Sequence, residues 1–172
     1  KRLDRRSDLY GAGLILLEML NGPFPYAEYS TSETHGRLVK GLPAVRRSHL
    51  KPGPQVPRGL RRVLRKSLSA RPADRYPTAS AMLAAVAKAD FVDWLPVRDD
   101  GDRLTWTGLS ARRTDREFQV TAEQRGSGAW RLTALQRVTR WQRFLDDVDV
   151  ASLSDGAATA FFDQVVTVAA ST

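Results

Sequence analysis

The chain has 172 residues, of which 42% are hydrophobic and 27% charged, a composition typical of globular rather than disordered protein. It contains no cysteine, which excludes disulfides and thiolate metal sites and is compatible with an intracellular origin. The net charge of +8 is uneven: residues 1–91 hold 17 Lys and Arg against 7 Asp and Glu, and residues 92–172 hold 10 against 12. This shift in charge favours a domain boundary near residue 91.

The first predicted element is a helix that lies between Asp8 and the stop signal Asn21-Gly22. Asp8 is expected to cap it, because a carboxylate there can accept hydrogen bonds from the unpaired N–H groups of the next turn. Gly22 is expected just past its end, since glycine tolerates the left-handed conformation found there. The apolar residues lie on nearly every side: Leu9, Leu14, Ile15, Leu16, Leu17, Met19 and Leu20. The helix is too short for a bilayer, which needs roughly 20 residues, so the pattern predicts a helix wrapped by protein.

A second helix is predicted over residues 31–40, after a Pro-rich connection. Ser32 is expected to cap it, and Gly41 is expected to end it. Residues 41–57 contain Pro and Gly and lack a helical period, so they are predicted to form a loop.

Two more helices are predicted over residues 58–69 and 78–89. Thr78 is the expected cap of the second, because its hydroxyl can accept from an N–H of the first turn. Five residues are expected to hold this last helix against the core: Ala79, Met82, Leu83, Ala85 and Val86.

Basic residues concentrate between residues 46 and 66, at Arg46, Arg47, Lys51, Arg58, Arg61, Arg62, Arg65 and Lys66. The last five flank the apolar side of the helix over residues 58–69, formed by Leu60, Val63, Leu64 and Leu68, so they are predicted on its outer face. A solvated helix face is the favoured interpretation, and a face for acidic partners or nucleic acid is the alternative. The lack of interleaved aromatics disfavours nucleic acid, and the lack of a large apolar face disfavours membrane attachment.

The second half of the chain changes from a helical to an alternating period. Residues 99–102, which include Gly101, predict a turn that leads into a strand over residues 104–107. Residues 117–122 and 129–135 alternate apolar and polar and are separated by Gly-Ser-Gly, a pattern typical of a hairpin. One face is expected to hold Phe118, Val120 and Ala122 with Trp130, Leu132 and Ala134, and Trp106 and Trp130 are interpreted as core residues.

A final helix is predicted from Asp155 to Ala169, with Ser154 as its cap. Its inward residues are expected to be Ala158, Phe161, Phe162, Val165, Val166 and Ala169. The expected fold class is therefore α+β: a mostly helical unit over residues 1–91, then a small antiparallel sheet with a packed C-terminal helix over residues 92–172.

No metal site is predicted from the acidic or histidine residues. Asp99, Asp100 and Asp102 lack the spacing and terminal Glu of a calcium loop and are interpreted as an acidic turn. The second acidic cluster, Asp146, Asp147 and Asp149, is interpreted as a solvated connector, and His35 and His49 are isolated in the sequence.

Two motifs resemble a known family. Ser-Asp-x-Tyr-x-x-Gly-x-x-x-x-Glu-x-Leu-x-Gly over residues 7–22, followed by Pro25 and Tyr26, resembles the F helix in the large lobe of eukaryotic-type Ser/Thr protein kinases of bacteria. Arg-Pro-Ala-Asp-Arg-Tyr-Pro over residues 71–77 is similar to the turn between the H and I helices of that lobe. The resemblance covers residues 1 to about 90 and implies that residues 1–91 hold helices F to I. Residues 92–172 match no family and are expected to form an accessory domain.

The resemblance implies roles for three scaffold residues. Asp8 matches the F-helix Asp that hydrogen-bonds the backbone of the catalytic loop, and Gly13 matches a small residue that permits close packing. Arg75 matches the Arg that pairs with the Glu ending the activation segment. Because that partner lies upstream of Lys1, Arg75 is expected to be solvated or paired differently here. The helix over residues 31–40 corresponds to the G helix, which makes Glu33, His35 and Arg37 candidate docking residues, although ordinary surface positions are the favoured interpretation.

The motifs that carry phosphoryl transfer are not in this sequence. It has no Gly-rich phosphate loop, catalytic-loop Asp or Asp-Phe-Gly, and its Gly-x-Gly at residues 11–13 lacks the third glycine of a nucleotide cradle. The expected function is thus a non-catalytic fragment of a Ser/Thr kinase, whose ATP and Mg²⁺ are implied for the parent alone. Its expected partners are the upstream kinase lobe and a protein substrate or regulator.

The alternative is a scaffold or binding module derived from a pseudokinase. A cytoplasmic parent is expected, because no signal peptide and no run of 18 apolar residues is found through Thr172.

Overall fold

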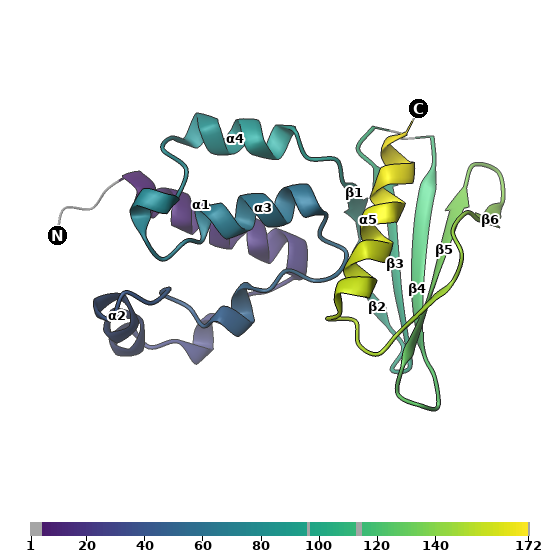
Figure 1. Ribbon diagram of the computed structural model, residues 1–172, viewed down its shortest axis with the longest axis horizontal. Helices are drawn as coiled ribbons and strands as arrows, with labels where there is room; N and C mark the ends of the chain where they lie inside the picture. The colour runs from purple at the N-terminus through teal and green to yellow at the C-terminus, as the bar shows by residue number, and fades with distance from the viewer. Residues whose placement is uncertain (1–4, 96, 113–114, 172) are drawn as a thin grey trace. The chain divides into compact units, whose positions relative to one another are not determined.

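The computed structural model describes residues 5–95, 97–112 and 115–171 and belongs to the α+β class, as expected (Figure 1). The chain divides into two compact units. The first comprises Lys1–Gly53 with Arg58–Ala89, and the second comprises Pro54–Pro57 with Asp90–Thr172. The first contains the helices α1 to α4, and the second contains the sheet and α5.

Helix α1 spans Arg5–Asn21 and buries Leu9, Tyr10, Gly13 and Leu17. It ends as predicted: Gly22 has φ +89° and donates its N–H to the Glu18 carbonyl at 2.8 Å. The predicted cap is wrong, because Asp8 lies inside the described helix as an exposed residue of its first turn. The expected burial on every side is also wrong, since Ile15 is 59% exposed and Met19 is 78% exposed.

The partial exposure of α1 has a physical reason. Its buried side meets α3 and α4, where Leu9 joins Val63, Tyr76 and Met82 in one apolar cluster. Apolar residues around a helix indicate that it prefers to be covered, but they do not say how many neighbours cover it. Among the described residues, neighbouring elements bury one side of α1 and leave Ile15 and Met19 exposed.

Helix α2 spans Thr31–Val39, preceded by a 3₁₀ turn at Tyr26–Glu28 and followed by another at Arg47–Leu50. Its cap is Ser30 rather than the predicted Ser32, because the Ser30 hydroxyl accepts from the Glu33 N–H at 3.0 Å. Two serines lie within one turn here, and the point at which the extended chain enters the helix decides which one caps it. The predicted stop is confirmed: Gly41 follows the helix with φ +69°.

Helices α3 (Arg58–Ser67) and α4 (Ala79–Ala87) follow, separated by a 3₁₀ turn at Pro72–Asp74. The predicted cap of α4 is confirmed, since the Thr78 hydroxyl accepts from the Ala81 N–H at 3.1 Å. Met82 is buried as expected, but Ala79 is exposed and Leu83 is 69% exposed. An alanine-rich helix has no strongly polar side, so its sequence pattern leaves the inward face poorly defined.

The sheet of the second unit is wholly antiparallel, with strand order β1-β3-β4-β5-β6 (Figure 1). Its long strands are β3 (Arg103–Ser110), β4 (Glu117–Gln124) and β5 (Trp130–Arg137), which confirms the predicted hairpin. Short strands complete it: β1 (Val92–Trp94) and β2 (Arg98–Asp99) pair with β3, and β6 (Trp141–Arg143) and β7 (Val148–Val150) pair with β5. These four short strands were not predicted.

Helix α5 (Gly156–Ala170) covers one face of this sheet (Figure 1). All six residues predicted to face inward are buried, and Trp106 is buried with its ring 5.1 Å from that of Phe162. The predicted cap is wrong: Asp155 occupies the cap position in place of Ser154, and its carboxylate accepts from the Ser152 N–H instead. Among the described residues, no helix is both long and apolar enough to cross a membrane.

Candidate functional site

Helix α1 packs against the end of α3 at Gly13, with no room for a side chain there. A Cβ atom placed there would lie 2.5 Å from the Ser67 Oγ and 3.1 Å from a Leu68 methyl carbon. Ser67 is fully buried, and its hydroxyl donates to the Leu64 carbonyl at 3.1 Å. Only glycine fits this crossing without displacing a buried neighbour.

Arg75 joins two segments of the first unit that are far apart in sequence. Its side chain is only 8% exposed, and it donates to three backbone carbonyls: those of Ser69 at 2.8 Å, Arg6 at 3.0 Å and Ala70 at 3.3 Å. Its guanidinium carbon lies 4.6 Å from the centre of the Tyr10 ring, within cation–π range. Of the two expected outcomes, Arg75 is therefore paired differently rather than solvated, and it ties the turn after α3 to the start of α1.

Tyr10, whose ring lies against the Arg75 guanidinium, is a neutral side chain. Burial raises the pKa of Tyr10, and the nearby charge of Arg75 acts in the opposite direction. The phenol therefore stays protonated at neutral pH, and its ring presents an uncharged face to the guanidinium.

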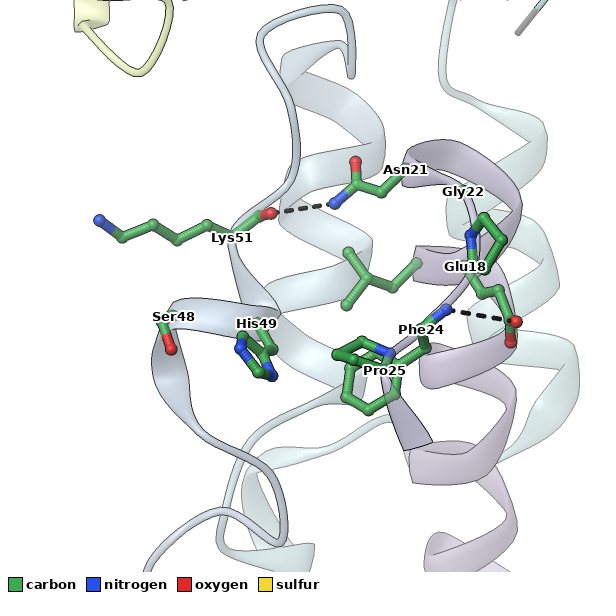
Figure 2. A pocket seen from close by; sticks show the side chains of 10 residues that line it. Glu18, Asn21, Gly22, Phe24, Pro25, Ser48, His49 and Lys51 are labelled. Carbon is green, nitrogen blue, oxygen red and sulfur yellow. Dashed lines mark hydrogen bonds between the residues drawn. The ribbon is translucent and has the colours of Figure 1, made fainter. Parts of the chain in front are cut away.

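A cavity of about 220 Å³ lies beside the C-terminal end of α1 (Figure 2). The Glu18 carboxylate accepts from the Phe24 N–H at 3.4 Å and from the Tyr26 hydroxyl at 3.0 Å, and the second bond raises the pKa of Tyr26. Asn21 donates to the Lys51 carbonyl and accepts from the Gly53 N–H, both at 2.9 Å.

Through these bonds the end of α1 holds two loops, the one that contains Phe24 and Tyr26 and the one that contains Lys51 and Gly53. Figure 2 shows the Lys51 side chain extending away from Asn21. The cavity is smaller than the roughly 300–1,000 Å³ typical of small-molecule sites. It lies where the end of α1 meets these two loops.

A polar network that the sequence did not reveal holds the chain around α2. The Tyr29 hydroxyl lies 2.7 Å from Nδ1 of His49 and accepts from the Arg46 N–H at 3.0 Å. The Arg46 guanidinium pairs with the carboxylates of Glu28 and Glu33, each at 3.3 Å. Aromatic residues and charges 13 to 20 positions apart cannot be assigned to one network from spacing alone.

The three candidate docking residues lie in different surroundings. Glu33 is half-buried in its pair with Arg46. Arg37 is half-buried and donates to the carbonyls of Pro43 at 2.9 Å and Val45 at 3.0 Å. His35 is exposed. Two of the three therefore hold the loop after α2, and only His35 has the exposure of a docking residue.

The basic face of α3 lies outward as its pattern predicted. Arg58, Arg62, Arg65 and Lys66 are exposed and Arg61 is half-buried, whereas the buried side of the helix carries Leu60, Val63, Leu64 and Ser67. The Lys66 ammonium lies 4.7 Å from the centre of the Tyr76 ring.

The described residues contain no group of three His, Asp or Glu side chains placed to hold a metal ion. ATP and Mg²⁺ stay expectations for a parent kinase.

About half of this chain is related to protein kinases, as comparison with curated proteins shows. It is 32% identical over 90 residues to the tyrosine-protein kinase MasK of Myxococcus xanthus (strain DK1622), which covers 50% of this chain and 13% of MasK. It is 33% identical over 94 residues to the serine/threonine-protein kinase pkn3 of Myxococcus xanthus, which covers 52% of this chain and 16% of pkn3. The matches thus span less than a fifth of either relative. No protein-family model and no solved structure matches the chain.

Proposed function

We propose that residues 1–91 are part of the large lobe of a Ser/Thr protein kinase, where they act as a scaffold. The observation that carries this proposal is the identity of 32% and 33% to two kinases over half of the chain. The geometry of Gly13 and Arg75 supports it, because both residues hold α1 firmly against the rest of the unit. Residues 92–172 act in this proposal as an accessory domain that binds a regulator or substrate.

Each scaffold residue has a distinct task. Asp8 is exposed in the first turn of α1, so its carboxylate is accessible to backbone N–H groups of a catalytic loop in the parent kinase. Gly13 sets the distance between α1 and α3. Arg75 fixes the start of α1, and with it the position of Asp8. The chain supplies this support, and the phosphate-binding groups come from the remainder of the parent kinase.

A segment exchange tests the proposal. The aligned segment of pkn3 is replaced by the matching residues of this chain, and ATP-dependent phosphorylation by the hybrid kinase is measured. We expect the hybrid to retain activity and Arg75→Met to lower it at least about tenfold, because a displaced α1 misplaces the catalytic loop. Arg71→Met is the matched control, since Arg71 is an exposed arginine four residues away.

The outcome against the proposal is a hybrid that is folded, as judged by circular dichroism, and yet inactive. Equal losses from Arg75→Met and Arg71→Met would also contradict it. The gene sequence upstream of Lys1 distinguishes the two kinds of parent: a His-Arg-Asp loop and an Asp-Phe-Gly indicate an active kinase, and their absence indicates a pseudokinase.

A further inference from the structure

Four exposed cations form one stripe along α3. Arg58, Arg62, Arg65 and Lys66, called the basic stripe below, are spaced i, i+4, i+7 and i+8, so they share one side of the helix. At a rise of about 1.5 Å per residue the stripe is about 12 Å long. The opposite side of α3 is buried, so the stripe is the side of this helix that a partner can reach.

The stripe is electrostatically unfavourable for the helix that carries it. None of the ten residues of α3 is acidic, and Arg58 stands at its first position, near the positive end of the helix dipole. Lys66 and Arg62 each stand four residues from another cation of the stripe, a spacing at which like charges repel. Within the described residues no carboxylate forms an ion pair with Arg62, Arg65 or Lys66.

We propose that the basic stripe is a docking surface for an extended acidic protein segment with carboxylates on alternate residues. Arg58, Arg62 and Lys66 follow one another at steps of about 6 Å along the helix axis. Alternate side chains of an extended segment point to the same side at steps of about 6.6–6.8 Å. Three alternate carboxylates can therefore meet these three cations, and Arg guanidinium groups bind carboxylates with two parallel hydrogen bonds.

Other anionic partners fit the stripe less well. Tyr76, the aromatic residue beside it, is buried with Lys66 against its ring, so it offers no open face to a nucleic-acid base. Attachment to a membrane needs an apolar side that can enter the lipid, and the apolar side of α3 lies in the core. This inference does not depend on the kinase proposal, because it uses only the surface of α3.

The test measures binding of a fluorescent peptide, Gly-Glu-Ser-Glu-Ser-Glu-Gly, to the full chain by fluorescence anisotropy, from about 20 to about 200 mM salt. Arg62→Glu is compared with Arg140→Glu, which makes the same change in net charge at an exposed arginine of the second unit. We expect Arg62→Glu to weaken binding at least about tenfold and Arg140→Glu to weaken it less than about twofold. The melting temperature of Arg62→Glu should rise, because two repulsive contacts become attractive.

Arg62→Gln is the second variant, and it should lose part of the affinity without a reversal of charge. Three outcomes would overturn the proposal. They are no binding even at the lowest salt, equal losses from Arg62→Glu and Arg140→Glu, and tighter binding to single-stranded DNA or to anionic lipid vesicles than to the peptide. A peptide of the same composition with three consecutive Glu should bind more weakly, and equal affinity would refute the alternate spacing.

Discussion

Gly13 and Gly11 allow a direct test of the packing between α1 and α3. Both glycines lie inside the same helix, two residues apart. A Cβ at Gly11 meets nothing within 4 Å, whereas a Cβ at Gly13 would lie 2.5 Å from the buried Ser67 Oγ and 3.0 Å from the Ser67 Cβ. Alanine at the two positions should therefore change the free energy of unfolding in opposite directions.

The size of each effect follows from two terms. Replacing glycine by alanine inside a helix stabilises it by about 0.5–1 kcal/mol, and this term alone applies to Gly11→Ala. Gly13→Ala gains the same amount but forces a buried contact apart, and overpacking of this kind costs about 1–3 kcal/mol. We expect Gly13→Ala to be destabilised by about 1 kcal/mol, which places the two variants about 2 kcal/mol apart.

Urea denaturation followed by far-ultraviolet circular dichroism measures this difference. Ser67→Ala supplies a double-mutant cycle, because it removes the hydroxyl that the new methyl group would meet first. Gly13→Ala should then cost less in the Ser67→Ala background than in the wild type. If Gly13→Ala is as stable as Gly11→Ala, α1 and α3 do not pack as described.

Two further predictions concern Arg75 and Asp149. Arg75→Met should lower the free energy of unfolding by about 3 kcal/mol or more, because three backbone carbonyls lose their donor. Urea denaturation measures this free energy. A change within about 0.5 kcal/mol would contradict the proposed role of Arg75 in tying the turn after α3 to the start of α1. The Arg131 guanidinium, 2.8 Å away, lowers the pKa of the Asp149 carboxyl in the folded protein. The pair therefore stabilises the fold at pH values above the pKa that this carboxyl has in the unfolded chain. That stability is lost as the pH falls through the lower pKa of the folded protein. The difference in melting temperature between wild type and Asp149→Asn should therefore be present at neutral pH and shrink below about pH 4, whereas a difference that is the same at both pH values would count against the pair.

The sequence was sufficient to predict an element and its buried face where one strong hydrophobic period ran through the whole element. In α5 the spacing of six apolar residues identified the buried face completely, and alternation around a Gly-Ser-Gly turn identified β4 and β5 as a hairpin. Gly22 and Gly41 marked the ends of α1 and α2, because a positive φ strongly favours glycine.

The sequence was insufficient where a choice depended on neighbours. The short strands β1, β2, β6 and β7 have two or three residues each, too few to show a period, and they form because β3 and β5 offer unpaired backbone groups. Leu83 on α4 was expected in the core and is exposed, since the pattern of an alanine-rich helix does not define its inward face.

The candidate site shows the same division. The motif around Arg75 predicted that this residue is solvated or paired differently, but it could not name the new partners. Its acceptors include the carbonyls of Arg6 and Ser69, which are far apart in sequence, and only the fold brings them together. Likewise the helical period correctly predicted that the basic stripe faces outward. Arg37 and Glu33, in contrast, bind the loop after α2, and no local sequence pattern predicts those contacts. The sequence of each element determines its local propensity and its period, and these predict the type of element and its buried face. Hydrogen-bond partners between distant segments depend on tertiary packing, which no local pattern records.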